Sequence, residues 1–270
     1  MVYTSIVQNR LINKKVIVTG ASSGIGKELV WHIARCGGIP IMLARSIEQL
    51  NNQRQMLKQS FGIIGYVYQV DLQNNEERER TIEQILKEHE QIHGLINNAG
   101  AGIFEFVKDT KQEDIDRMFQ LNLFALIHLT KRFLLHFSYY QSGHIVNVAS
   151  QAGKIATPKS AVYASTKHAV LGFTNALRLE VKKEGISVTA VNLGPVRTNF
   201  FTAADPDGIY QKNVGRLMLE PDDVAQKIIR HLFTNKREIN LPSWMEIGSK
   251  LYHIFPRTAE RLLKRQFNKK

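Results

Sequence analysis

The stretch Thr19-Gly20-Ala21-Ser22-Ser23-Gly24-Ile25-Gly26 decides the predicted fold of this chain. It follows a short β-branched run at 15–19 and leads into an amphipathic stretch at 24–35, which predicts a turn from a strand into a helix. Three glycines there suit a tight turn, a close approach of the backbone to a phosphate, and packing of the helix near the strand. A pyrophosphate would lie at the positive end of that helix. The spacing G-x3-G-x-G is weak evidence alone, so a purely structural turn stays an alternative.

Outward from this turn, β-branched runs alternate with amphipathic stretches along most of the chain. Parallel neighbours need crossover connections, which cover both faces of a sheet with helices. We therefore predict an α/β fold, a doubly wound parallel sheet of seven strands. The predicted strands are 15–19, 39–44, 63–70, 94–97, 144–149, 187–192 and 238–241, and the predicted helices are 24–35, 47–60, 75–90, 111–137, 161–183 and 221–234.

The length of 270 residues suits a single domain with a tail. We expect a domain at 1–248 and a basic, amphipathic, helical extension at 249–270. The segment at about 195–220 carries both turn residues and aromatic residues, which favours a loop that covers the substrate over a plain insertion.

Composition excludes several classes of protein. Hydrophobic residues make up 43% and charged residues 22%, which is typical of a globular chain. Cys36 is the only cysteine, so no intramolecular disulfide can form. The first ten residues lack the basic-then-apolar order of a signal peptide, and we expect a cytoplasmic protein.

The end of the second predicted strand indicates which dinucleotide would bind. Sites that prefer NAD usually place Asp or Glu there, to bind the ribose 2′-hydroxyl. Here the strand ends Leu43-Ala44-Arg45-Ser46, and Arg45 can bind a 2′-phosphate with two hydrogen bonds. This predicts NADP(H), although a surface arginine at a strand end is the alternative.

Further motifs follow in order: Asn97-Asn98-Ala99-Gly100, Asn122, Ser150 and Tyr163-Ala164-Ser165-Thr166-Lys167. Together with the glycine turn, they make the chain from residue 15 to about residue 241 resemble the short-chain dehydrogenase/reductases. The resemblance implies a Rossmann-type sheet, a nicotinamide cofactor and hydride transfer between a carbonyl and an alcohol. It also implies a homodimer or homotetramer, and we expect a hydrophobic ketone as the substrate.

The chemistry of the residues agrees with that reaction. Tyr163 and Lys167 are four residues apart on a predicted helix and so share a face. An adjacent ammonium would lower the pKa of the phenol, which becomes the proton donor. Ser150 follows a strand and can hydrogen-bond the carbonyl oxygen. By resemblance, Lys167 also holds the nicotinamide ribose, and Asn122 supports a water that relays protons to Lys167.

The remaining cofactor residues come from the resemblance. Asp71 and Leu72 would contact adenine and Asn98 the adenosine ribose, although Asp71 and Asn98 could equally be strand-end caps. Gly194, Val196 and Thr198 fit the site of the nicotinamide carboxamide, where Leu193 replaces the usual proline. The predicted cofactor contacts are Gly20, Ser22, Ser23, Gly24, Ile25, Gly26, Arg45, Asp71, Leu72, Asn98, Tyr163, Lys167, Gly194, Val196 and Thr198.

Two other functions remain as alternatives. His89-Glu90-Gln91-Ile92-His93 matches the zinc-peptidase pattern H-E-x-x-H, but a strand is predicted directly after His93, so we expect a chance match and no metal. A catalytically weak NADP-binding module is the second alternative.

Half of the net positive charge of the chain lies near the C-terminus. Of the net charge of +12, residues 250–270 hold +6, from seven basic residues and one acidic residue. Nucleic acid is not expected as a partner, because no nucleic-acid-binding motif accompanies these charges. The apolar residues Leu251, Phe255, Leu262 and Phe267 are expected to pack against the body or a second subunit, and peripheral contact with an anionic membrane is the alternative.

Overall fold

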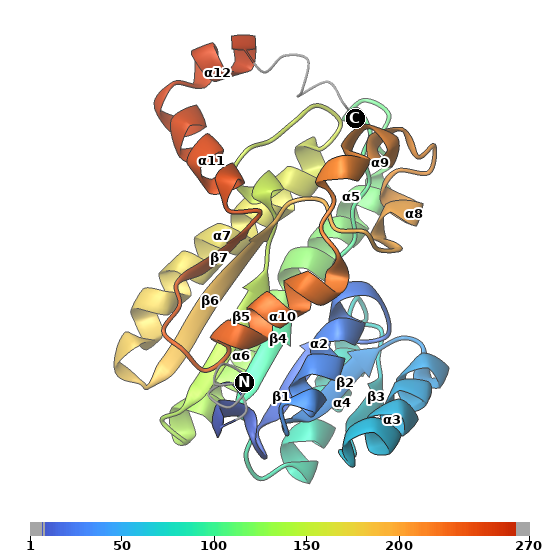
Figure 1. The fold of residues 1–270 in the computed structure, drawn as a ribbon, viewed down its shortest axis with the longest axis vertical. Helices are drawn as coiled ribbons and strands as arrows, with labels where there is room; N and C mark the ends of the chain where they lie inside the picture. Colours follow the sequence, from blue (N-terminus) through green and yellow to red (C-terminus); the bar gives the residue numbers. More distant parts are fainter. Residues whose placement is uncertain (1–6, 8, 263–270) are drawn as a thin grey trace.

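The computed structural model describes residue 7 and residues 9–262 of the chain. All neighbouring strands pair in parallel, in the order β3-β2-β1-β4-β5-β6-β7, which confirms the predicted doubly wound sheet (Figure 1). The strands are β1 (Lys15–Thr19), β2 (Ile39–Ala44), β3 (Tyr66–Gln69), β4 (Gly94–Asn97), β5 (Gly143–Val148), β6 (Ile186–Leu193) and β7 (Glu238–Leu241).

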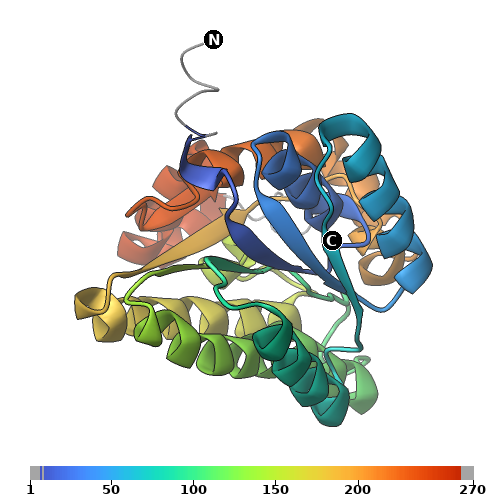
Figure 2. The ribbon, with the colours of Figure 1, turned by 90° about the horizontal axis from the view of Figure 1, so that it is seen from below.

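Helices cover both faces of the sheet (Figure 2). On one face, α2 (Gly24–Arg35), α3 (Ile47–Phe61) and α10 (Pro221–His231) bury apolar side chains against alternate strand residues such as Val16 and Val18. On the other face, α4 (Asn75–Glu88), α6 (Ala125–Tyr139) and α7 (Ala161–Glu180) pack against Ile17 and its neighbours. Successive strand residues face opposite sides of the sheet because the side chains of a strand have a period of two residues.

Local sequence explains where several of these helices begin and end. The Asn74 side chain accepts hydrogen bonds from the backbone of Glu76 and Glu77, which starts α4. Gly62, at φ 70°, ends α3 in the left-handed conformation. Pro221 occupies the first turn of α10, where it has no hydrogen bond to lose.

Several predicted boundaries are wrong, among them the ends of α7 and α10, which lie three residues before the predicted residues 183 and 234. The edge strand β3 begins at Tyr66, not at residue 63, because its pairing with β2 starts there. Helix α4 ends at Glu88 instead of residue 90. The helix predicted over 111–137 is divided into α5 (Gln112–Phe119), a π-helical turn (Gln120–Phe124) and α6. A π-turn adds one residue to the helical period, which the average apolar pattern hides.

The segment predicted to cover the substrate contains short helices. They are α8 (Phe200–Ala204), α9 (Ile209–Val214) and a 3₁₀ turn (Gly215–Leu217). The chain then continues through α10 and β7 into α11 (Trp244–Ile254) and α12 (Pro256–Leu262), which project from the body (Figure 1). Every helix in the described ranges is too short or too polar to cross a bilayer.

The C-terminal helices correct part of the sequence prediction. Helix α11 begins before residue 249, so the predicted domain boundary falls within a continuous helix. Leu251, Phe255 and Leu262 are 54%, 60% and 74% exposed, so the expected packing of these residues against the body is wrong. Phe267 lies outside the described residues. Packing against a second subunit stays a prediction.

A buried histidine makes the fold sensitive to acid. His144 of β5 contacts the Thr189 hydroxyl at 2.9 Å through Nε2, and its Nδ1 accepts a hydrogen bond from the Phe233 backbone N–H at 2.7 Å. Burial, and to a lesser degree Arg10, lower the pKa of His144 to about 3 from an ordinary 6.5. Between these values the unfolded chain binds more protons than the folded one, so stability falls as the pH falls.

We expect acid destabilisation that depends on His144. At pH 5 the histidine contributes about 2 kcal/mol to the loss of stability, or about 5 °C in Tm. Thermal unfolding between pH 7 and pH 5 measures this loss, and His144→Gln should flatten the decline. His168→Gln, at an exposed histidine, is the matched control. Equal pH slopes in the wild type and in His144→Gln would contradict this account.

Candidate active site

The glycine turn forms a backbone cradle at the N-terminus of α2. Gly20 and Gly24 have φ of 65° and 52°, a conformation that favours glycine. A Cβ atom on Gly26 would lie 2.1 Å from the Gly20 carbonyl oxygen, so no larger residue fits without a backbone shift. The Ser23 side chain does not cap α2, so the N–H groups at the start of this helix are suited to an anion.

The end of β4 is tied to this turn by hydrogen bonds. The Thr19 hydroxyl accepts from the backbone N–H groups of Asn98 and Ala99, both at 3.0 Å. The Asn98 side chain donates to the Thr19 carbonyl at 2.9 Å. Asn98 thus joins the carboxyl ends of β1 and β4, where ligands bind in sheets of this type.

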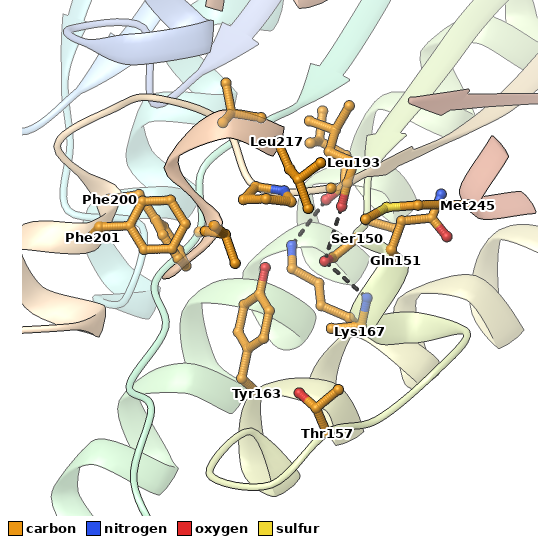
Figure 3. Close-up of a pocket in the computed structure, with 18 of the residues that line it drawn as sticks. Ser150, Gln151, Thr157, Tyr163, Lys167, Leu193, Phe200, Phe201, Leu217 and Met245 are labelled. Carbon is orange, nitrogen blue, oxygen red and sulfur yellow. Dashed lines mark hydrogen bonds between the residues drawn. The ribbon is translucent and has the colours of Figure 1, made fainter. Parts of the chain in front are cut away.

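Tyr163 and Lys167 lie together on α7, as their spacing predicts. Both side chains are buried, and the Lys167 ammonium lies 5.8 Å from the centre of the Tyr163 ring. Lys167 also donates to the Val148 carbonyl at the end of β5, at 3.0 Å. Ser150 follows β5, and its hydroxyl donates to the Leu193 carbonyl at 3.3 Å and accepts from the Ala152 N–H at 3.0 Å (Figure 3).

Burial dominates the protonation of this pair. It raises the pKa of Tyr163 to about 12, against a smaller lowering by the hydrogen bond with Ser150. It also lowers the pKa of Lys167 to about 8. The net effect in this structure is a raised tyrosine pKa, because burial disfavours the charged phenolate. Tyr163 is protonated at neutral pH and can act as a proton donor.

Asn122 is held beside Lys167 by the π-helical turn. Its side chain accepts from the Ala101 N–H and donates to the Ala101 carbonyl, both at 2.8 Å, and it donates to Thr166 at 3.0 Å. A Cβ atom on Gly100 would lie 3.2 Å from the side-chain oxygen Oδ1 of Asn122 and 3.6 Å from the Lys167 ammonium. The π-turn thus places Asn122 next to the lysine, and its part in a proton relay stays a prediction.

A cavity of about 430 Å³ joins these residues. Ser150, Tyr163 and Lys167 line it, together with the predicted cofactor residues Ile25, Asn98, Gly194, Val196 and Thr198. Most of the other side chains in its wall are apolar or aromatic: Phe104, Ile155, Leu193, Phe200, Phe201, Tyr210, Val214, Leu217, Trp244 and Met245 (Figure 3). The wall of the cavity is therefore mainly apolar, with Ser150, Tyr163 and Lys167 among its polar side chains.

The remaining predicted cofactor residues lie outside the cavity wall. Gly20, Ser22, Ser23, Gly24 and Gly26 follow β1, Arg45 follows β2, and Asp71 and Leu72 follow β3. All three strands end at the same edge of the sheet. Arg45 is exposed, whereas the Asp71 carboxylate accepts from the Gln73 N–H at 3.0 Å, which fits the strand-end cap that was the alternative for this residue.

The sequence predicted only some of the aromatic rings that surround Tyr163. The rings of Phe104 and Phe200 each lie with their centres 5.8 Å from that of Tyr163. Phe200 belongs to the segment that was predicted to cover the substrate, but no sequence signal indicated Phe104. Gln151 and Thr157, which also line the cavity, were missed as well, although Gln151 directly follows Ser150.

The start of α11 is an unpredicted part of the cavity wall. A polar cluster centred on Lys154 holds it: the ammonium contacts Glu238 of β7 at 2.7 Å, Asn240 at 3.0 Å and Glu246 of α11. The Lys154 side chain is only 13% exposed. The cluster attaches α11 to the sheet edge and places Met245 in the cavity wall.

The zinc-peptidase motif does not form a shared site. Because α4 ends at Glu88, the motif lies beyond the helix. His89 contacts the Tyr68 hydroxyl at 2.9 Å, whereas His93 accepts from the Lys15 N–H at 3.1 Å. In the described part of the chain, no group of three or more His, Cys, Asp or Glu side chains could hold a metal ion.

Comparisons with known proteins agree with this geometry. The model of the short chain dehydrogenase family matches residues 14–208. Human 17-beta-hydroxysteroid dehydrogenase 13 is 31% identical over 94% of this chain and 83% of its own length. A short-chain dehydrogenase from Sphingobium yanoikuyae, solved in complex with NADPH, has a TM-score of 0.78 and 26% identity, over 90% of this chain and 95% of its own. A short chain dehydrogenase/reductase from Burkholderia phymatum, solved with NAD, shares the fold, with a TM-score of 0.82 and 21% identity over 92% of this chain and 95% of its own.

Proposed function

Because the chain belongs to the short chain dehydrogenase family, we propose that it uses NADPH to reduce a hydrophobic ketone to the alcohol. One observation carries the proposal: Tyr163, Ser150 and Lys167 meet in a cavity whose other walls are mainly apolar. This combination supplies a proton donor and a hydrogen-bond partner for a carbonyl oxygen, and it favours an apolar substrate body.

The residues present fit a nicotinamide dinucleotide. A Cβ atom on Gly26 would clash with the Gly20 carbonyl oxygen, and one on Gly24 would lie 3.0 Å from Thr198, so the turn accepts only glycine at both positions and keeps its backbone accessible to a ligand. The turn would hold the pyrophosphate, Arg45 the 2′-phosphate, and Gly194, Val196 and Thr198 the carboxamide. When bound, the cofactor supplies the hydride.

The chain's own side chains account for the proton chemistry. Ser150 orients the carbonyl by a hydrogen bond to its oxygen. Tyr163, protonated at neutral pH, donates its phenol proton to that oxygen as negative charge develops there. Lys167 places a positive charge beside the ring, which stabilises the phenolate left after the transfer. The phenol is then reprotonated from solvent, for which Asn122 and Lys167 offer a route.

Arg45 supports NADP(H) over NAD(H), as does the NADPH bound by the Sphingobium relative. We expect at least about tenfold tighter binding of NADPH than of NADH, or ~1.4 kcal/mol. Arg45→Asp should reverse the preference, because the carboxylate repels a 2′-phosphate and binds a ribose 2′-hydroxyl. Titration of both cofactors by intrinsic fluorescence measures this, with Arg54→Asp on α3 as a control for the change in charge. Equal dissociation constants in the wild type would contradict the preference.

A panel of ketones, with the loss of NADPH absorbance as the readout, tests the activity. Turnover of bulky apolar ketones in preference to small polar ones supports the proposal. Tight NADPH binding without turnover of any ketone would instead favour an NADP-binding module. We also propose that the protein forms a homo-oligomer and lies in the cytoplasm. Its chain is proposed to consist of a catalytic domain followed by a basic extension.

A further inference from the structure

Helix α11 carries a row of exposed apolar side chains. Trp244, Ile247, Leu251 and Ile254 are 54%, 64%, 54% and 66% exposed. Their spacing of three, four and three residues places them along one side of the helix, here called the α11 apolar face. Phe255, 60% exposed, follows at the helix end. Large apolar side chains gathered on one surface in this way mark an interaction site.

The body of the protein holds this face outward. On the opposite side of α11, Ser249 is buried and Met245 lines the cavity. Glu246 contacts Lys154, which is bound in turn to Glu238 and Asn240. These contacts fix the rotation of the helix about its axis, so the apolar face is directed away from the sheet.

The apolar face is continuous with the mouth of the cavity. Trp244 belongs to both, since it lines the cavity and is 54% exposed. Leu217, from the segment that covers the cavity, also lines it and is 44% exposed. The opening is therefore bordered by apolar side chains from two separate elements.

Cations accompany this surface. Lys250, Arg257 and Arg261 are exposed on α11 and α12, and Arg216 is exposed next to Leu217. Over residues 250–270 the sequence has a net charge of +6. Apolar side chains flanked by cations are typical of segments that lie on an anionic membrane.

We propose that the α11 apolar face docks on an anionic lipid bilayer, and that the cavity opens toward the acyl chains. The net positive charge of residues 250–270 disfavours a second copy of this chain on the same face, because two segments of +6 would repel each other. A second copy would also cover the mouth at Leu217 and Trp244. Entry of a lipid-soluble ketone from the bilayer rests on the proposed function, whereas docking does not.

Co-sedimentation of the full chain with vesicles tests the docking without cofactor or substrate. We expect binding to vesicles of phosphatidylcholine with phosphatidylglycerol, and little binding to phosphatidylcholine alone. Raising the salt from ~0.1 M to ~1 M, which shortens the Debye length from ~10 Å to ~3 Å, should release most of the protein. Ile247→Glu combined with Leu251→Glu should lower the bound fraction about tenfold.

A matched control variant shows whether a loss of vesicle binding is specific to the α11 apolar face or follows from replacing any two exposed apolar residues. Ile12→Glu combined with Ile64→Glu changes two exposed residues, 51% and 58%, just before β1 and β3, at the opposite end of the strands. It should bind vesicles as the wild type does. Equal binding by both double variants, or no binding of the wild type to anionic vesicles, would overturn the proposal. So would a lower mass by light scattering for Ile247→Glu with Leu251→Glu, which would assign the face to a second copy.

Discussion

Tyr163→Phe is expected to lower kcat for ketone reduction by about 10²- to 10⁴-fold, the usual contribution of a positioned proton donor. The substitution removes one hydroxyl and leaves the ring beside Phe104 and Phe200. The affinity for NADPH should therefore change little. Steady-state kinetics and a fluorescence titration on the same preparations measure the two quantities.

A second buried tyrosine provides the control. Tyr68 is buried at β3, where its hydroxyl contacts His89 at 2.9 Å, and it does not line the cavity. Tyr68→Phe also removes a buried hydroxyl, yet it should retain turnover. Undiminished reduction of an accepted ketone by Tyr163→Phe would refute the assigned proton donor.

Lys167→Ala is expected to damage both turnover and cofactor binding. The ammonium lies beside the Tyr163 ring, and the resemblance to the family predicts that it would contact the nicotinamide ribose. We expect a fall in kcat of about 10²-fold or more and weaker NADPH binding by about tenfold, or ~1.4 kcal/mol. This combined loss differs from the selective loss expected for Tyr163→Phe.

Lys183→Ala removes an exposed lysine just beyond the end of α7 and serves as the matched control for charge. Circular dichroism confirms that each variant is folded. Normal NADPH binding by a folded Lys167→Ala variant would contradict the part of this account that places the lysine at the ribose.

The sequence predicted most of the fold because the chemistry of the glycine turn is local. Gly20, Gly24 and Gly26 mark the end of β1 and the start of α2, and both elements lie at their predicted positions. The four-residue spacing of Tyr163 and Lys167 likewise requires only that α7 be a helix. Predictions that depended on tertiary context were less accurate: pairing with β2 sets the start of β3, and the π-turn at Asn122 leaves no mark in the apolar pattern.

Much of the cavity wall could not be predicted for the same reason. Trp244 and Met245 line it from α11, which Lys154 connects to β7 by contacts with side chains more than eighty residues further along the chain. Burial raises the pKa of Tyr163 and the hydrogen bond with Ser150 lowers it to a smaller degree, and both depend on the packed structure. Residue types and spacing indicated the proton donor, but the packed structure determined its protonation.

Transfer of deuterium from NADPH deuterated at C4 of the nicotinamide tests the central claim most directly. The wild type is incubated with the labelled cofactor and an accepted apolar ketone, and the alcohol is analysed by mass spectrometry. We predict that one deuterium is bonded to the carbinol carbon, and that Tyr163→Phe forms little labelled alcohol in the same time. An alcohol that carries no deuterium from either face of the labelled nicotinamide, or equal labelled product from Tyr163→Phe, would contradict hydride transfer at this site.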